Sequence, residues 1–143
     1  MKIRPGHLRK NAKIEMLRKV PLFAQCSRKE LDEIAGVADE LQLADGRELT
    51  REGARGREFF VVIDGALEVR RKTRKIATLG GGDFVGEMAL VTGRPRNATV
   101  TTKGVVRALV ITDRAFARLL AASPTIQLKI MRALAERVPD PTH

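Results

Sequence analysis

Glycines divide the middle of the chain into short segments. They recur at positions 46, 53, 56, 65, 80 to 82, 86, 93 and 104, between runs rich in Val, Leu, Ile, Phe and Thr. Short β-forming runs separated by turn residues are typical of antiparallel sheets that close on themselves. We therefore predict a mainly β fold, with about eight short strands over residues 41–111 forming an antiparallel β-roll or jelly roll.

Two dipeptides in this region carry hairpin-type turn signals. Asp45-Gly46 and Asp64-Gly65 both combine a residue that tolerates positive φ with a glycine. The run "EFFVVI" precedes the second dipeptide and "ALEVR" follows it. The sequence therefore predicts a hairpin at Asp64-Gly65, between two apolar strands.

Residues 1–40 read as a helical segment that belongs to the same domain. A first helix carries an apolar stripe and should end at Pro21, and "SRKE" (27–30) is a capping-box pattern that opens a second helix. The second helix keeps the spacing of one buried face. The stripe of the first helix is Leu8, Ile14, Leu17 and Val20, and that of the second is Leu31, Ile34, Ala35, Ala38 and Leu41.

The sequence of residues 112–138 predicts two further helices after the roll. Thr112-Asp113 starts a helix that buries Phe116, Leu119 and Leu120, and Ser123-Pro124 starts another as N-cap and first helical residue. The last helix carries Ile126, Ile130 and Leu134 and stops at the "PDP" of residues 139–141. These apolar residues suit either the roll or a homodimer, and spacing alone does not separate the two.

The chain of 143 residues has 27 Lys and Arg against 17 Asp and Glu, a formal net charge of +10. This balance favours anionic partners such as nucleic acid, acidic surfaces or small phosphates. The cations gather in the first 20 residues and in "RRKTRK" (70–75). No apolar run approaches the roughly 20 residues of a membrane span. No secretory signal is evident and Cys26 is the single cysteine, so we expect a packed thiol and a cytoplasmic protein.

The segment "GEMALVTGRPRNATV" (86–100) joins a carboxylate to an arginine through a short apolar helix. An ionised Glu87 only accepts hydrogen bonds, which suits a sugar hydroxyl, whereas the guanidinium of Arg96 suits two phosphate oxygens. Asn97 and Ala98 leave backbone N–H groups accessible beside Arg96, and Gly86 permits close approach. The segment therefore fits a ligand with a phosphate and a free sugar hydroxyl; the alternative is a surface turn with solvated charges.

The longer stretch "GGGDFVGEMALVTGRPRNATV" (80–100) resembles the phosphate-binding cassette of the cyclic nucleotide-binding domain family. "PLFAQCSRKEL", "REGARGREFFVVIDGALEV" and "ASPTIQLKIMRALAERV" resemble other parts of that family in the expected order, so the resemblance spans residues 17–138. It implies that Glu87 binds the ribose 2′-hydroxyl and that Arg96 neutralises the cyclic phosphate. It places Gly86, Met88, Ala89, Asn97 and Ala98 along the phosphate and sugar, and Val69 and Ile76 against the base.

Three departures from the family pattern concern selectivity and affinity. Asn97 stands where members usually have Ala, Ser or Thr, so the choice between cyclic AMP (cAMP) and cyclic GMP (cGMP) stays open. Arg57 stands where several members carry an acid that braces the phosphate arginine, and Glu58 is the candidate substitute. The absence of Trp and Tyr excludes the aromatic lid that some members place over the base. A lid from the last helix would be aliphatic or would be Arg137 stacking as a cation; the alternative for Arg137 is a helix-terminal cation that favours the dipole.

From this resemblance we expect a non-catalytic cyclic-nucleotide sensor, with cAMP as ligand, that relays binding through its helices to a separate protein partner. The histidines, His7 and His143, lie near the ends of the chain, so we expect no metal site and no cofactor. We expect no DNA-binding domain after the roll. The alternatives are a protein that binds nucleic acid or an acidic surface through its basic face, and a degenerate member of the family that no longer binds nucleotide.

Overall fold

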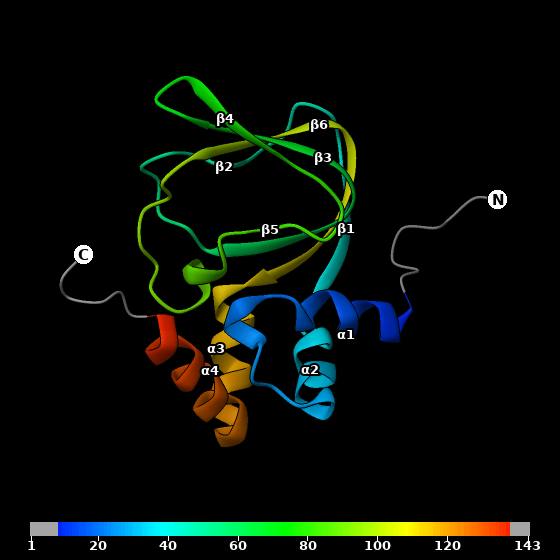
Figure 1. Cartoon of the computed structure of the whole chain (residues 1–143), viewed down its shortest axis with the longest axis vertical. Helices are drawn as coiled ribbons and strands as arrows, with labels where there is room; N and C mark the ends of the chain where they lie inside the picture. The colour runs from blue at the N-terminus through cyan, green and yellow to red at the C-terminus, as the bar shows by residue number, and fades with distance from the viewer. Residues whose placement is uncertain (1–8, 138–143) are drawn as a thin grey trace.

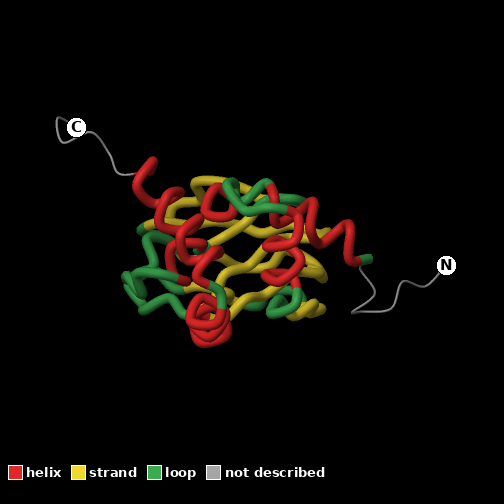
Figure 2. The backbone as a smooth tube through the Cα atoms, turned by 90° about the horizontal axis from the view of Figure 1, so that it is seen from below, coloured by secondary structure: helices red, strands yellow, loops and turns green. Residues whose placement is uncertain are grey.

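The computed structural model describes residues 9–137, in which a β-roll stands on a layer of helices (Figure 1). The elements follow one another along the chain as α1 (Lys10–Arg18), η1 (Pro21–Phe23), α2 (Arg28–Ala35), β1 (Asp39–Leu43), β2 (Glu48–Thr50), β3 (Glu58–Arg71), β4 (Arg74–Leu79), β5 (Phe84–Val85), η2 (Glu87–Leu90), β6 (Thr99–Thr112), α3 (Asp113–Ala122) and α4 (Pro124–Arg137). Viewed from below, the helices cover one end of the strands (Figure 2).

All strand pairs in the described residues are antiparallel, and the sheet runs in the order β1-β6-β3-β4, with β2 on β6 and β5 on β3. The strands β3 and β6 are 14 residues long, and the register between them shifts around Asp64. Such irregularities bend a strand without ending it. Each long strand therefore supplies two of the short strands expected from the sequence, and the predicted β-roll is confirmed.

The hairpin predicted at Asp64-Gly65 is wrong, because β3 runs straight through this dipeptide. Gly65 has a φ of 103°, and a Cβ there would lie 2.8 Å from the carbonyl oxygen of Val105 on β6. Gly65 thus permits a bend in β3 and its close approach to β6. The hairpin lies instead at Lys72-Thr73, where φ values of 51° and 66° give the two-residue turn that matches strand twist. The basic run 70–75 therefore forms the tip of the β3–β4 hairpin.

The predicted starts of α2, α3 and α4 are confirmed. Ser27 and Glu30 form the capping box, Thr112 caps α3 through the N–H of Ala115 at 3.1 Å, and α4 begins at Pro124. One prediction at the end of α2 is wrong: the helix stops at Ala35, with Gly36 as its C-cap, and Leu41 lies on β1 with 40% of its surface exposed.

An aromatic cluster joins the N-terminal and C-terminal helices to the roll. The ring of Phe23 in η1 lies 5.9 Å from that of Phe59 on β3 and 5.8 Å from that of Phe116 on α3. All three side chains are fully buried, in one core with Ile126 and Ile130 of α4. The two ends of the described chain therefore fold as one unit with the roll. No helix among residues 9–137 is long and apolar enough to span a bilayer.

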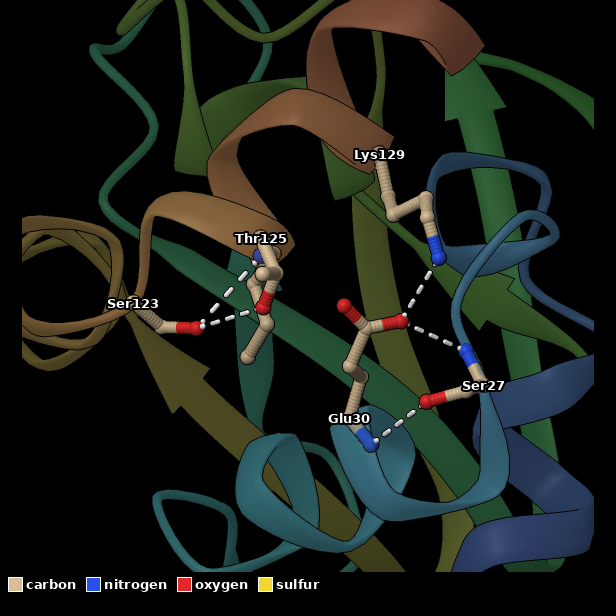
Figure 3. A network of polar contacts seen from close by, with 6 residues as sticks. Ser27, Glu30, Ser123, Thr125 and Lys129 are labelled. Carbon is tan, nitrogen blue, oxygen red and sulfur yellow. Dashed lines mark hydrogen bonds and ion pairs between the residues drawn. The ribbon is translucent and has the colours of Figure 1, made fainter.

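A polar network also ties α2 to α4 (Figure 3). The buried carboxylate of Glu30 accepts hydrogen bonds from the backbone N–H of Ser27 at 2.7 Å and from Nζ of Lys129 at 2.9 Å. The Ser27 N–H and, to a lesser degree, Lys129 lower the pKa of Glu30 from 4.5 to about 2, against the opposing effect of burial. The ionised carboxylate is thus the form that the folded protein stabilises.

This network predicts an acid-sensitive contribution to stability. Because the pKa of Glu30 is lower in the folded state than in the unfolded state, its contribution is complete above pH 4.5 and is lost as the pH falls toward 2. We expect Glu30→Gln to be less stable than the wild type near neutral pH and to lose less stability on acidification. Urea unfolding across this range tests this, with the exposed Glu33→Gln as the control on the same helix; identical acid profiles for Glu30→Gln and wild type would contradict it.

Candidate functional site

A cavity of about 610 Å³ opens between the roll, η2 and the loop of residues 92–98. Its volume is within the usual range for small-ligand pockets. One wall is apolar, with side chains from β3, β4, β5 and β6, and another carries the charged residues of η2 and the loop. Among the predicted ligand-binding residues, the following line this cavity: Val69, Gly86, Glu87, Met88, Ala89, Arg96, Asn97 and Ala98.

The structure does not bring Ile76 to the cavity. The pairing between β3 and β4 shifts by one residue after Val69, which faces Ala77, so Ile76 falls in the irregular step and is 47% exposed. A one-residue shift moves side chains to the other face of a strand. Ala77 and Leu79 of β4 line the cavity in its place. Arg137 is the last residue of α4, and its side chain lies outside the described residues.

Glu87 opens η2, a short 3₁₀ helix, and its side chain is buried, which excludes the alternative of a solvated surface charge at this position. Gly86 precedes it with a φ of 79°, a conformation that favours glycine. The carboxylate oxygen Oε2 of Glu87 accepts a hydrogen bond from the backbone N–H of Leu22 at 3.0 Å. The charged group of the cavity is therefore attached directly to η1, which lies 65 residues away in the sequence.

Arg96 lies against two glycines. A Cβ on Gly56 would be 2.5 Å from its Nε, and a Cβ on Gly86 would be 1.9 Å from its Nη1. The Nη2 atom donates a hydrogen bond to the carbonyl oxygen of Glu58. Only glycine at both positions leaves room for the guanidinium, so the two glycines hold the side chain at the edge of the cavity.

The charge of Arg96 is incompletely compensated within the protein. Partial burial lowers the pKa of its guanidinium, and the Glu58 carboxylate offsets part of this effect. Among residues 9–137, no carboxylate lies within ion-pair distance of Arg96, and the only hydrogen bond of its guanidinium goes to the Glu58 carbonyl oxygen. A partly buried cation of this kind stabilises a bound anion.

Two hydrogen bonds that hold the loop of residues 92–98 could not be predicted from the sequence of the loop. Thr50 Oγ1 donates to the carbonyl oxygen of Ala98 at 2.9 Å, and Arg71 Nε donates to that of Asn97 at 2.9 Å. The brace on Arg96 comes from the Glu58 carbonyl, whereas the sequence suggested its side chain. The acceptor in each of these bonds is a backbone carbonyl, which every residue type has. The residue types therefore do not predict which carbonyl is used, and only the fold shows it.

Other reactive groups lie away from the cavity. Cys26 is buried, as expected, and burial, aided by the charge of Glu30, raises the pKa of its thiol to about 11. No group of three or more His, Cys, Asp or Glu in the described part of the chain could hold a metal ion. The chemistry of the cavity thus rests on Glu87, Arg96 and its apolar wall.

Comparison with known proteins agrees with this geometry. The family model described as "Cyclic nucleotide-binding domain" matches residues 40–123, which is more than half of the chain. The chain belongs to the cyclic nucleotide-binding domain family. The cAMP-dependent protein kinase regulatory subunit of Mycosarcoma maydis is 36% identical over 116 residues, covering 74% of this chain and 22% of that protein. The chain spans between 22% and 35% of the length of the curated relatives it matches.

Two solved structures share the fold of this cyclic nucleotide-binding domain. The N-terminal domain of a transcriptional regulator from Streptomyces coelicolor A3(2) is 29% identical with a TM-score of 0.78, covering 85% of this chain and 91% of that one. A cyclic nucleotide-binding-like protein from Brucella abortus is 27% identical with a TM-score of 0.71, covering 76% and 97%. Both comparisons support the β-roll with flanking helices.

Proposed function

We propose that this cyclic nucleotide-binding domain binds cAMP in the 610 Å³ cavity and acts as a non-catalytic regulatory module. The observation that carries the proposal is the partly buried Arg96, which lines the cavity without a carboxylate partner among residues 9–137. A cyclic phosphate supplies the missing negative charge. The name of the Mycosarcoma maydis relative supports cAMP as the nucleotide.

Glu87 completes the recognition of the sugar. An ionised carboxylate has about four lone-pair sites on its two oxygens, so Glu87 can accept a ribose hydroxyl while it accepts the N–H of Leu22. The base then packs on the apolar wall formed by Val69, Ala77 and Leu79. This arrangement separates the polar and apolar parts of one ligand and requires no chemical step.

The first experiment is calorimetric titration of the whole chain with cAMP and with cGMP at moderate salt. We expect micromolar or tighter binding of cAMP, about −8 kcal/mol, and weaker binding of cGMP. The absence of heat and of any thermal shift with either nucleotide would refute the proposal.

We further propose that nucleotide binding is relayed to α4 through η1. Glu87 bonds to the backbone of Leu22 in η1, and η1 contacts α4. Beyond η1, Gln25 Nε2 donates to Glu136 of α4 at 2.6 Å, and Lys129 of α4 donates to Glu30. A ligand hydroxyl that binds Glu87 therefore acts on η1, which packs on α4 and is followed in the chain by the two residues, Gln25 and Glu30, that bond to α4.

The relay is tested by hydrogen exchange of α4 with and without cAMP. A ligand shifts a conformational equilibrium only by its differential affinity for the two states. We expect the exchange rates of α4 amides to change on binding, although α4 does not line the cavity. Unchanged rates in α4 together with protection of η2 would leave nucleotide binding intact and refute the relay.

A matched pair of glycine substitutions tests the placement of Arg96. Gly86 and Gly82 both have positive φ, 79° and 90°, so alanine strains the backbone at each. Only at Gly86 does the new Cβ collide with Arg96; at Gly82 nothing lies within 4 Å. We expect Gly86→Ala to weaken cAMP binding about tenfold or more, through displacement of a charge-assisted bond, and Gly82→Ala to leave it nearly unchanged. Equal affinities in the two variants would contradict the role of Gly86.

A further inference from the structure

A second cavity, of about 300 Å³, lies beside the first and shares Arg96 with it. Its lining combines β2 with the loop that follows it and with Glu58 at the start of β3. Four arginines and two glutamates contribute: Arg51, Arg55, Arg57, Arg96, Glu48 and Glu58. The formal charge of this lining is therefore +2, from four positive and two negative groups.

The arginines of this cavity differ in how many bonds they form within the protein. Arg51 Nε pairs with Glu48 Oε1 at 2.8 Å. The guanidinium groups of Arg55 and Arg57 form no hydrogen bond or ion pair with any residue in the described part of the chain. Arg55 packs near Gly93, where a Cβ would lie 3.3 Å from its Nη2. Two cations thus stand beside the partly compensated Arg96 with free donors.

The backbone that carries these arginines is fixed in place. The N–H of Gly53 donates to the Arg96 carbonyl at 2.8 Å, and the N–H of Arg96 donates to the Ala54 carbonyl at 2.7 Å. Arg55 also forms an isolated antiparallel bridge with Pro95. These backbone contacts join the loop that carries Arg55 and Arg57 to the loop that carries Arg96, so the three arginines belong to one backbone frame.

We propose that this second cavity is an anion site, separate from the nucleotide cavity, that binds a phosphoryl group of a small ligand through Arg55, Arg57 and Arg96. Guanidinium forks match phosphoryl oxygens, and three neighbouring cations favour an anion of more than one charge. Arg57 and Arg96 line the same cavity, so more than one guanidinium group is available to a single bound anion.

Because Arg96 belongs to both cavities, the two ligands are coupled. A phosphoryl group in the second cavity competes for the donors of Arg96 and places negative charge near a cyclic phosphate in the first. We therefore expect each ligand to weaken the other by the same factor, since coupling is reciprocal. This coupling rests on the proposed binding of cAMP, whereas the anion site itself does not.

The test is calorimetric titration of the full chain with inorganic pyrophosphate at constant ionic strength. We expect binding to the nucleotide-free protein that is weakened about tenfold or more in the double variant Arg55→Gln/Arg57→Gln. The matched control is the double variant Arg114→Gln/Arg118→Gln, at two exposed arginines of α3 outside both cavities, for which we expect less than a twofold change. Thermal unfolding of each variant confirms that it is folded.

Three results would overturn the site: no pyrophosphate binding, equal binding in Arg55→Gln/Arg57→Gln, or the same loss in Arg114→Gln/Arg118→Gln. Short duplex DNA that binds through Arg55 and Arg57 where pyrophosphate does not would overturn the small-ligand assignment in favour of nucleic acid. Saturating cAMP should raise the dissociation constant of pyrophosphate; an unchanged constant would refute the coupling. If cAMP fails to bind and pyrophosphate still binds through Arg55 and Arg57, the nucleotide function falls and the anion site stands.

Discussion

Replacing Arg96 with alanine is expected to weaken cAMP binding by about 3 kcal/mol, roughly a hundredfold. The guanidinium lies at the edge of the cavity between Gly56 and Gly86, and no carboxylate among residues 9–137 pairs with it. Removing it leaves the cyclic phosphate partly buried without its counter-charge. Calorimetric titration of the variant measures the loss directly.

Two further variants separate the causes of that loss. Arg96→Lys keeps the positive charge but lacks the planar fork and the reach to the Glu58 carbonyl, so we expect an intermediate affinity. Arg114→Ala on α3 removes a cation outside the cavity and controls for the overall charge of +10. If Arg114→Ala weakened binding as much as Arg96→Ala, long-range attraction would explain the affinity and the local site would not.

The sequence predicts the fold best where the signal is local. The capping box at Ser27, the cap at Thr112 and the start of α4 at Pro124 each depend on residues within one turn, and all three are confirmed. The wrong hairpin at Asp64-Gly65 shows the limit of such signals. An Asp-Gly pair suits both a tight turn and a bend within paired strands, and only the partner strand, β6, decides between them.

For the candidate site too, the sequence predicts the local features and misses those that depend on distant segments. Glu87 and Arg96 stand out by residue type and spacing, and both line the cavity. Ala77 lines the cavity where Ile76 was predicted to do so, because the pairing between β3 and β4 shifts by one residue. The alternation of side chains along a strand cannot locate such a shift. The bond from Leu22 to Glu87 joins segments 65 residues apart. Contacts of this kind form only when the roll closes, so local residue patterns do not predict them.

The second large effect is expected at Phe23, a core residue of η1 that follows Leu22, whose N–H binds Glu87 of the first cavity. Its ring is fully buried between Phe59 of β3 and Phe116 of α3. Phe23→Ala leaves a cavity where three elements meet, and such truncations cost about 3–5 kcal/mol. Since domains of this size unfold with about 5–15 kcal/mol, the variant should lose a large fraction of its stability. Urea unfolding measures the change.

The same substitution also loosens η1, whose Leu22 N–H binds Glu87. Saturating cAMP should restore part of the lost stability, because a ligand that binds only the folded state adds to the free energy of unfolding. The matched control is Leu109→Ala: this side chain is fully buried in the same core, but it lies on β6, outside η1 and outside the first cavity. If Phe23→Ala changed stability by less than about 1 kcal/mol, well below the cost of a core truncation, the aromatic cluster would not be what joins η1 to the roll. A large loss of stability in Phe23→Ala, with hydrogen exchange in α4 that no longer responds to cAMP, would instead identify η1 as the segment through which the cavity and α4 communicate.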